Sequence, residues 1–240
     1  MSEEDLMASI KTLENQVTAL GNQVRNLQDI EEINTLQKAY GYYLEHWMTQ
    51  EIIDCFSNGS DVALTLVGGT YLGKQSVKRY FEHNNPTSEF LHQVMQLSGI
   101  VNVDPDGKTA KGRWYGYGAM AVPRDKGVRQ AFLGGIYGCE YVKEDGKWKF
   151  KKLRFDISYY ASPAEGWVEP ERVAVISTQE PPTIIKADIP RTFMTQYPSG
   201  YIFPFHYKHP VTGKETTEGA INSAIEGVES CKIAANNKIV

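Results

Sequence analysis

The side chains best suited to chemistry lie close together in the segment 40–47. Tyr40 and Tyr43 supply phenols, and Glu45 supplies a carboxylate next to His46. On the inner side of a helix that closes a sheet, an acid and two phenols would form a pocket with a reactive wall. The same residues also fit a structural role, with the tyrosines in the core and Glu45 and His46 solvated near a helix end. The segment alone leaves both interpretations open.

The elements around this segment predict an α+β fold. Apolar residues at helical spacing predict a long amphipathic helix within 30–56, which feeds a strand at 62–66. A short helix is predicted over 73–81. Four longer strands follow at 91–103, 109–122, 128–143 and 148–159, with hairpin turns at 104–107 and 145–146. This order predicts helices packed on one face of a curved antiparallel sheet.

The segment 5–30 has a heptad pattern whose apolar positions alternate in steps of four and three: Leu6, Ile10, Leu13, Val17, Leu20, Val24 and Leu27. β-Branched residues at one seam position and leucine at the other are typical of a short coiled coil. Asn15, Gly21 and Asn22 are expected to weaken it. An amphipathic helix packed on its own domain fits equally well. Either arrangement must bury the stripe, which favours a homo-oligomer, a dimer or a trimer.

Composition limits the function classes. The net charge is −4, and no basic stripe suggests binding to nucleic acid. No apolar run is long enough to span a membrane. The acidic N-terminus lacks the basic region of a secretory signal, so a cytoplasmic protein is expected. The three cysteines, Cys55, Cys139 and Cys231, lack metal-ligand spacing and indicate reduced thiols. The five histidines also lack such spacing, so no metal site is predicted.

Beyond residue 160 the pattern changes. Residues 161–240 are rich in proline but also in aromatic residues, in which a disordered tail would be depleted. An ordered arm is expected, packed over the domain or over a neighbouring subunit, with a weak helix over 217–234. The predicted organisation is an N-terminal amphipathic or coiled-coil helix (1–29), a central domain (30–160) and a C-terminal extension (161–240).

Several motifs of the central domain together resemble the nuclear transport factor 2-like (NTF2-like) superfamily, and more narrowly its SnoaL-like branch, which includes scytalone dehydratase. They are the segments 40–47 with Phe56, 69–73 ahead of Ser76-Val77, His92, 106–114 and 141–150 with Leu153. The resemblance covers about residues 28–160. It implies a cone formed by a curved sheet and three helices, with an apolar ligand at the open end and no cofactor.

The resemblance also assigns residues. The dehydratase uses an acid late in the first helix, which corresponds to Glu45, and a histidine that opens the second long strand, which corresponds to His92. Its second catalytic histidine is replaced near Met120, which puts the dehydration reaction itself in question. Glu45 and His92 make a plausible acid–base pair with Tyr43 close by, and a hydrogen bond from Glu45 would favour charged His92. His92 bonded to backbone at a strand start is the structural alternative.

Strand alternation predicts the wall of the cone. If Trp114 faces inward, so do Gly116, Gly118 and Met120, and the glycines leave space for a planar ligand. Leu153 and Phe155 would then face inward as well. The expected substrate-binding residues are aromatic or apolar: Tyr40, Tyr71, Trp114, Met120, Tyr137, Leu153 and Phe155. For Tyr71 and Tyr137, a place in the core is the alternative.

These features predict a cofactor-independent lyase that acts on a small phenolic or polyketide-like compound by proton transfer. Dehydration and retro-aldol loss of an aldehyde both suit, and the chain is similar to proteins of lignin-dimer catabolism that release formaldehyde. An isomerase or cyclase of a natural-product pathway is the alternative within enzymes. A non-catalytic ligand-binding or assembly module, with the cone filled by side chains, is the alternative outside them.

Overall fold

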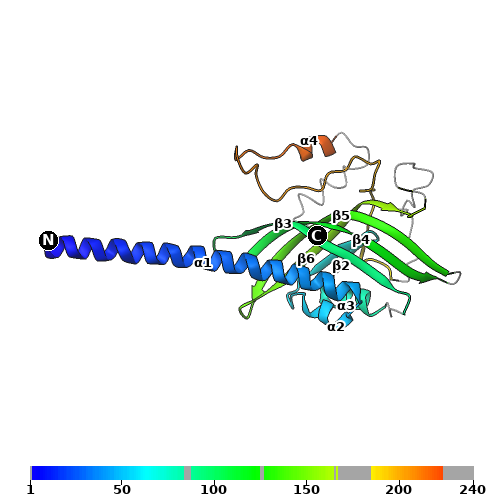
Figure 1. Ribbon diagram of the computed structural model, residues 1–240, viewed down its shortest axis with the longest axis horizontal. Helices are drawn as coiled ribbons and strands as arrows, with labels where there is room; N and C mark the ends of the chain where they lie inside the picture. Colours follow the sequence, from blue (N-terminus) through cyan, green and yellow to red (C-terminus); the bar gives the residue numbers. More distant parts are fainter. Residues whose placement is uncertain (1, 84–87, 125–126, 165, 167–184, 224–240) are drawn as a thin grey trace.

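The computed structural model describes residues 2–83, 88–124, 127–164, 166 and 185–223. It contains a seven-stranded curved sheet with helices on its concave face and a C-terminal arm on the opposite face (Figure 1). The expected α+β fold is confirmed. None of the described helices is both long and apolar enough to cross a membrane.

One helix, α1 (Glu3–Glu45), replaces the two helices expected over 5–30 and 30–56. A capping box begins it: the Ser2 hydroxyl accepts a hydrogen bond from the backbone N–H of Asp5, and the Asp5 carboxylate accepts one from the backbone N–H of Ser2. Its last turns carry the buried residues Asp29, Ile33, Gln37, Tyr40 and Leu44. Its first half projects out of the body as a free rod (Figure 1), so that half does not pack on its own domain.

The helix ends where the backbone of Trp47 takes a positive φ of 50°. A new short helix, α2 (Thr49–Asp54), begins after this turn, so the helix expected to run on to residue 56 is broken. The indole Nε1 of Trp47 donates to the carbonyl of Phe81, 2.9 Å away, at the end of α3 (Gly73–Glu82). The buried indole therefore joins the end of α1 to α3, and the three helices close one end of the sheet.

The sheet has the strand order β3-β4-β5-β6-β1-β2-β7. Its strands are β1 (Ala63–Leu66), β2 (Gly69–Leu72), β3 (Leu91–Val103), β4 (Thr109–Arg124), β5 (Gly127–Glu144), β6 (Lys147–Ala161) and β7 (Ile189–Pro190). The four long strands match the predicted ranges within a few residues. Two details differ from the expectation: β1 pairs with β6 in parallel, and 69–72 forms a strand.

Alternation along the strands separates two faces, as predicted. Trp114, Tyr137, Leu153 and Phe155 lie in the core beneath the sheet. The intervening residues face outward, and of these Tyr115 remains 58% exposed. The concave face and the helices therefore enclose the core, while the convex face carries a second layer.

The arm forms that second layer over the convex face of its own sheet. Arg113 donates to the carbonyls of Phe203 and Pro204, at 2.9 and 3.1 Å. The ring of Phe203 occupies the place where a Cβ on Gly138 would lie, so the glycine admits it. The described part of the arm includes α4 (Glu218–Asn222), within the helix expected over 217–234; residues 224–234 of that expectation lie outside the described residues.

Candidate functional site

His92 lies on the concave side of β3, opposite Met120 on β4. The indole of Trp47 meets its ring edge-on at 5.7 Å, and the ring of Phe90 is parallel to it at 6.3 Å. Burial lowers the pKa of His92 to about 4. His92 is therefore neutral at pH 7, contrary to the expectation that Glu45 would favour its charged form.

The Nδ1 atom of His92 is buried without a hydrogen-bond partner. Buried polar atoms are nearly always paired, so an unpaired imidazole nitrogen calls for a particular explanation. A neutral imidazole nitrogen that is not engaged elsewhere can accept or donate a proton. Among the described residues this is the side chain with the clearest capacity for proton transfer on the concave side.

Glu45 is not paired with His92 in the described structure. Its carboxylate accepts a hydrogen bond of 3.3 Å from the amide of Gln93, the residue that follows His92 on β3. Adjacent residues of a strand point to opposite faces, so the partner of Glu45 lies on the other side of the strand from the imidazole. The structure thus brings Glu45 to the same strand segment as His92 without the expected hydrogen bond.

The tyrosines of the predicted wall are packed among other rings. Tyr40 is buried, with Phe150 at 5.3 Å and Tyr137 at 6.5 Å, both edge-on. Burial raises the pKa values of Tyr40 and Tyr137 well above their usual range, so both phenols stay protonated. Tyr43 is partly buried against this cluster. The wall therefore presents neutral aromatic groups.

The space expected beside the inward glycines is filled. The ring of Tyr137 stacks on that of Phe155 at 4.2 Å. A Cβ on Gly116 would lie 2.6 Å from one ring and 2.7 Å from the other. A Cβ on Gly118 would meet the backbone of β3 at Gln93. The planar groups beside Gly116 are the protein's own rings, and the expectation of a ligand gap at these glycines was wrong.

The remaining predicted wall residues have distinct surroundings. The hydroxyl of Tyr71 donates to the carbonyl of Ile185, 3.2 Å away, so its polar end is used by the start of the arm. Leu153 is buried between β1 and β5. Met120 is only partly buried, and Trp114 is fully buried. Of these four, Met120 is the one paired with His92 across the strands. It places a thioether where the resemblance would put a second catalytic histidine.

A buried series of hydrogen bonds was not predicted from the sequence. The indole Nε1 of Trp114 donates to the hydroxyl of Tyr141 at 3.0 Å, and that hydroxyl donates to Gln37 Oε1 at 2.7 Å. Gln37 Nε2 then donates to Gln96 Oε1 at 2.8 Å. The signal that could have revealed it is Gln37 itself, an amide at a core position between Ile33 and Tyr40. These hydrogen bonds fix α1 to the sheet and place polar groups deep in an aromatic core.

The convex face has a cavity of about 160 Å³ beneath the arm, with Arg113, Asp156, Thr195 and Tyr201 in its wall. Burial would raise the pKa of Asp156, but the adjacent guanidinium groups of Arg154 and Arg191 lower it overall. This site holds a carboxylate in its charged form. It is the electrostatic opposite of the neutral site at His92.

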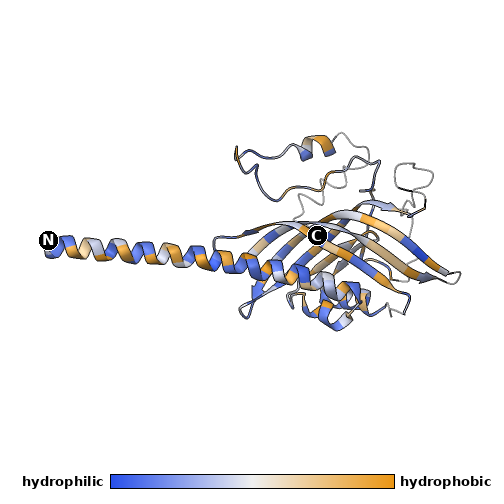
Figure 2. Cartoon of the chain, in the orientation of Figure 1, coloured by the Kyte–Doolittle hydropathy of each residue, from blue (hydrophilic) through white to orange (hydrophobic). Residues whose placement is uncertain are grey.

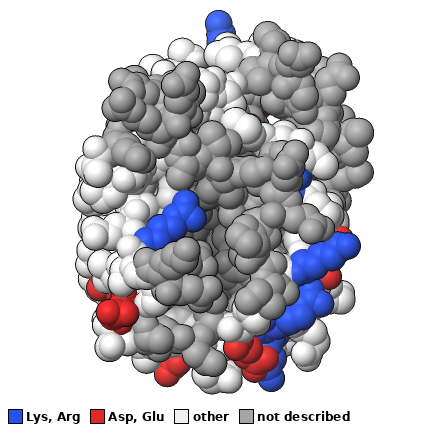
Figure 3. All heavy atoms as spheres, turned by 90° about the vertical axis from the view of Figure 1, so that its right-hand side faces the viewer, with Lys and Arg blue, Asp and Glu red and all other residues white. Residues whose placement is uncertain are grey.

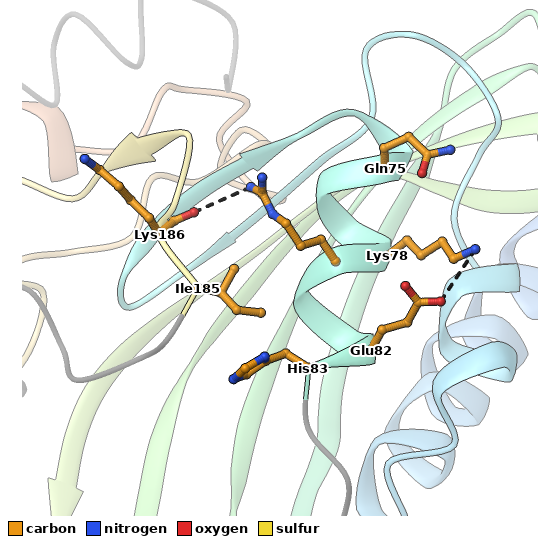
Figure 4. A pocket seen from close by; sticks show the side chains of 7 residues that line it. Gln75, Lys78, Glu82, His83, Ile185 and Lys186 are labelled. Atoms are coloured by element: carbon orange, nitrogen blue, oxygen red, sulfur yellow. Dashed lines mark hydrogen bonds and ion pairs between the residues drawn. The ribbon is translucent and has the colours of Figure 1, made fainter.

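A larger open hollow of about 760 Å³ lies between α3 and the start of the arm, and it was not predicted (Figure 4). Three of its charged side chains have partners: Lys78 lies 3.5 Å from Glu82, and Arg79 lies 3.1 Å from Asp188. The end of the molecule that faces away from the free helix shows basic and acidic side chains next to each other at its edge (Figure 3). The hollow is therefore lined mainly by polar and charged side chains, and none of the predicted site residues is among them.

No cluster of three or more potential metal-ligating side chains occurs in the part of the chain that the structure describes. Cys55 and Cys139 are buried free thiols, and burial raises the pKa of each to about 12. Cys231 lies outside the described residues. The two described thiols are thus protonated at neutral pH and poorly suited to nucleophilic attack.

Residues 25–154 match the family described as SnoaL-like domain. Three structures from Novosphingobium aromaticivorans are similar in fold: a candidate aromatic ring hydroxylase (21% identity, 55% of this chain and 90% of that one, TM-score 0.46), a candidate scytalone dehydratase (19%, 58% and 90%, 0.48) and an NTF2-like protein with a cystatin-like fold (17%, 58% and 88%, 0.44). No curated protein matches the chain. These likenesses concern the fold alone.

Proposed function

This chain belongs to the SnoaL-like family, and we propose that it is a cofactor-independent lyase for a small phenolic or polyketide-like compound. The observation that carries the proposal is the neutral imidazole of His92, whose buried Nδ1 atom has no hydrogen-bond partner and which lies among aromatic rings. Such a group suits removal of a proton from a substrate whose own rings pack on Trp47 and Phe90.

His92 acts as the base in this proposal. In loss of water, it takes a proton from carbon, the carbon–oxygen bond breaks, and the departing hydroxyl leaves with a proton from an acid. In a retro-aldol release of formaldehyde, it takes the proton of a primary alcohol, the carbon–carbon bond breaks, and the resulting carbanion is protonated. Neither reaction requires an oxidant or a reductant. Both need a second proton-transferring group.

Tyr43 and Glu45 are the proposed second groups. Tyr43 is partly buried against the core, so its hydroxyl is suited to hold a phenol oxygen or a developing oxyanion. The single hydrogen bond of Glu45, to Gln93, is long at 3.3 Å and is easily exchanged for one to a substrate. Tyr40, Tyr137 and Phe155 form the buried aromatic core behind these groups.

A non-catalytic role for the cone is supported by a different observation. The stacked Tyr137 and Phe155 fill the space beside Gly116, as expected when side chains replace a ligand. An isomerase or cyclase would use the same base but would leave the mass of the substrate unchanged. A single assay separates these functions. A lyase lowers the mass of the substrate, an isomerase or cyclase changes its structure at constant mass, and a binding module returns it unchanged.

The test is incubation of the purified chain with a panel of phenolic dimers and hydroxylated bicyclic compounds, followed by mass spectrometry. Loss of water or of formaldehyde is the expected result. His92→Gln should lower kcat by about 100- to 10,000-fold, the usual contribution of a general base. His46→Gln is the matched control, because His46 is an exposed histidine beside the same site and its replacement should leave kcat unchanged.

Two further variants separate the roles. Glu45→Gln and Tyr43→Phe each remove one proton-transferring group, and both should lower kcat more than they raise KM. Binding of a compound that is recovered with both its mass and its structure unchanged would support the ligand-binding module. Full turnover in both the His92→Gln and the Glu45→Gln variants would contradict the acid–base assignment.

A further inference from the structure

The first half of α1 carries an apolar seam that no other part of the described chain covers. The seam consists of the seven heptad residues identified above, from Leu6 to Leu27. All seven are between 43% and 68% exposed. Figure 2 shows their hydrophobic bands repeating along the free rod. Most of the stability of a helix in a protein comes from packing of its apolar face, so the exposed seam requires a partner.

The seam points away from the domain to which it is attached. At about 100° per residue, the seam positions lie on the side of α1 roughly opposite to Asp29, Ile33 and Tyr40, which are buried in the domain. A second helix could therefore lie along the seam without meeting the sheet. The exposed Tyr42 extends the same free side farther along α1.

The identities of the seam residues specify the partner. Ile10, Val17 and Val24 occupy the a positions, and leucine occupies every d position. β-Branched residues at a with leucine at d favour two parallel strands over three or four. Asn15 and Asn22, expected from the sequence to weaken the seam, both fall at f positions, where they face solvent.

The flanking positions permit self-association. In a parallel pair each g residue faces an e residue of the other chain. Here the g positions are Ser9, Gln16 and Gln23, and the facing e positions are Glu14, Gly21 and Gln28. A single charged residue occurs in this set, so no g–e pair places like charges together. We propose that the first half of α1 pairs with the same segment of a second copy as a parallel, two-stranded coiled coil.

The first test is the mass of the full chain by light scattering at low micromolar concentration. Val17→Asp with Leu20→Asp places charges in the seam and should halve the mass of the assembly. Asn15→Asp with Asn22→Asp is the matched control, which adds the same charges at f positions and should leave the mass unchanged. An unchanged mass in the seam variant, or a fall to one third, would overturn the proposal.

Disulfide trapping tests the orientation and does not depend on a destabilised variant. In a Cys231→Ser background, Leu6→Cys and Leu27→Cys each place one thiol at an end of the seam. Parallel pairing in register places each thiol next to the same thiol of the second chain. Each variant alone should therefore form a cross-linked dimer under mild oxidation. Cross-links that appear only when the two variants are mixed would show antiparallel pairing and contradict the proposal.

Discussion

The two faces of the sheet handle buried polar groups in opposite ways. On the concave face, burial moves the pKa of His92 down and those of Tyr40 and Tyr137 up, so all three are neutral. On the convex face, Asp156 is buried but remains charged, because Arg154 and Arg191 lie 2.7 Å from its oxygens. Only the concave face therefore leaves an imidazole free for proton transfer, while the convex face uses its charges to hold the arm.

The strongest way to break this comparison is to remove the carboxylate of the convex face. Asp156→Ala leaves two largely buried guanidinium groups without their shared anion. We expect the free energy of unfolding to fall by about 3–5 kcal/mol, as for one partner of a buried ion pair. Urea denaturation measures this loss. A change below about 1 kcal/mol would mean that the arm does not depend on this pair.

The pH dependence of stability probes the concave face. Because the pKa of His92 is about 4 when folded and near 6.5 when unfolded, the unfolded chain binds the additional proton. The stability that the neutral imidazole contributes is present above pH 6.5 and is lost as the pH falls from 6.5 to 4. The full loss is roughly 3 kcal/mol.

His206 also has a pKa lowered to about 4, chiefly by burial, so its titration overlaps this window. The share of His92 is the difference between the wild-type chain and His92→Gln, measured by denaturation at pH 6.5, 5 and 4. His92→Gln and His206→Gln should each flatten the curve, because each histidine has a folded pKa of about 4. Equal slopes in the wild-type chain and His92→Gln would contradict a buried neutral His92.

A neutral hydrogen bond on the concave face should have a smaller effect. Tyr141→Phe removes the hydroxyl that accepts from Trp114 and donates to Gln37. Leaving these buried groups unpaired should lower the free energy of unfolding by about 1–3 kcal/mol. Urea denaturation would measure it, with the exposed Tyr115→Phe as the control. No loss would mean that water replaces the missing hydroxyl.

The smallest effect is expected for an exposed ion pair. Asp61 lies 2.6 Å from Lys151, but its side chain is 57% exposed. Asp61→Asn should change the free energy of unfolding by less than about 1 kcal/mol. Comparison with Asp156→Ala, by the same denaturation, separates the effect of burial from that of charge. If Asp61→Asn lowered the free energy of unfolding as much as Asp156→Ala does, burial could not explain the large effect expected at Asp156.

The sequence predicted the features that follow from periodicity. Strand alternation placed Trp114 and Phe155 inward and Tyr115 outward, and the hairpin turn expected at 104–107 joins β3 and β4. The break of α1 was missed at Trp47, where a positive φ accompanies the hydrogen bond from its indole to Phe81. That contact joins residues far apart in the sequence, which no local pattern can report.

The protonation of the site could not be predicted for a similar reason. The sequence placed a carboxylate and an imidazole near one another and suggested a charged pair. Whether they pair depends on which side of β3 the end of α1 reaches, and Glu45 meets Gln93 instead. The gap expected at Gly116 likewise depended on where Tyr137 and Phe155 stack. The location of the site was predictable, but its electrostatics required the packing.

The central claim, that His92 is a buried neutral base, is tested most directly by NMR titration of its imidazole nitrogens. Loss of the signal in His92→Gln gives the assignment. The account predicts a neutral imidazole at pH 7 that gains its proton only near pH 4. A His92 that titrates near its ordinary pKa of about 6.5, or that is charged at pH 7, would contradict it.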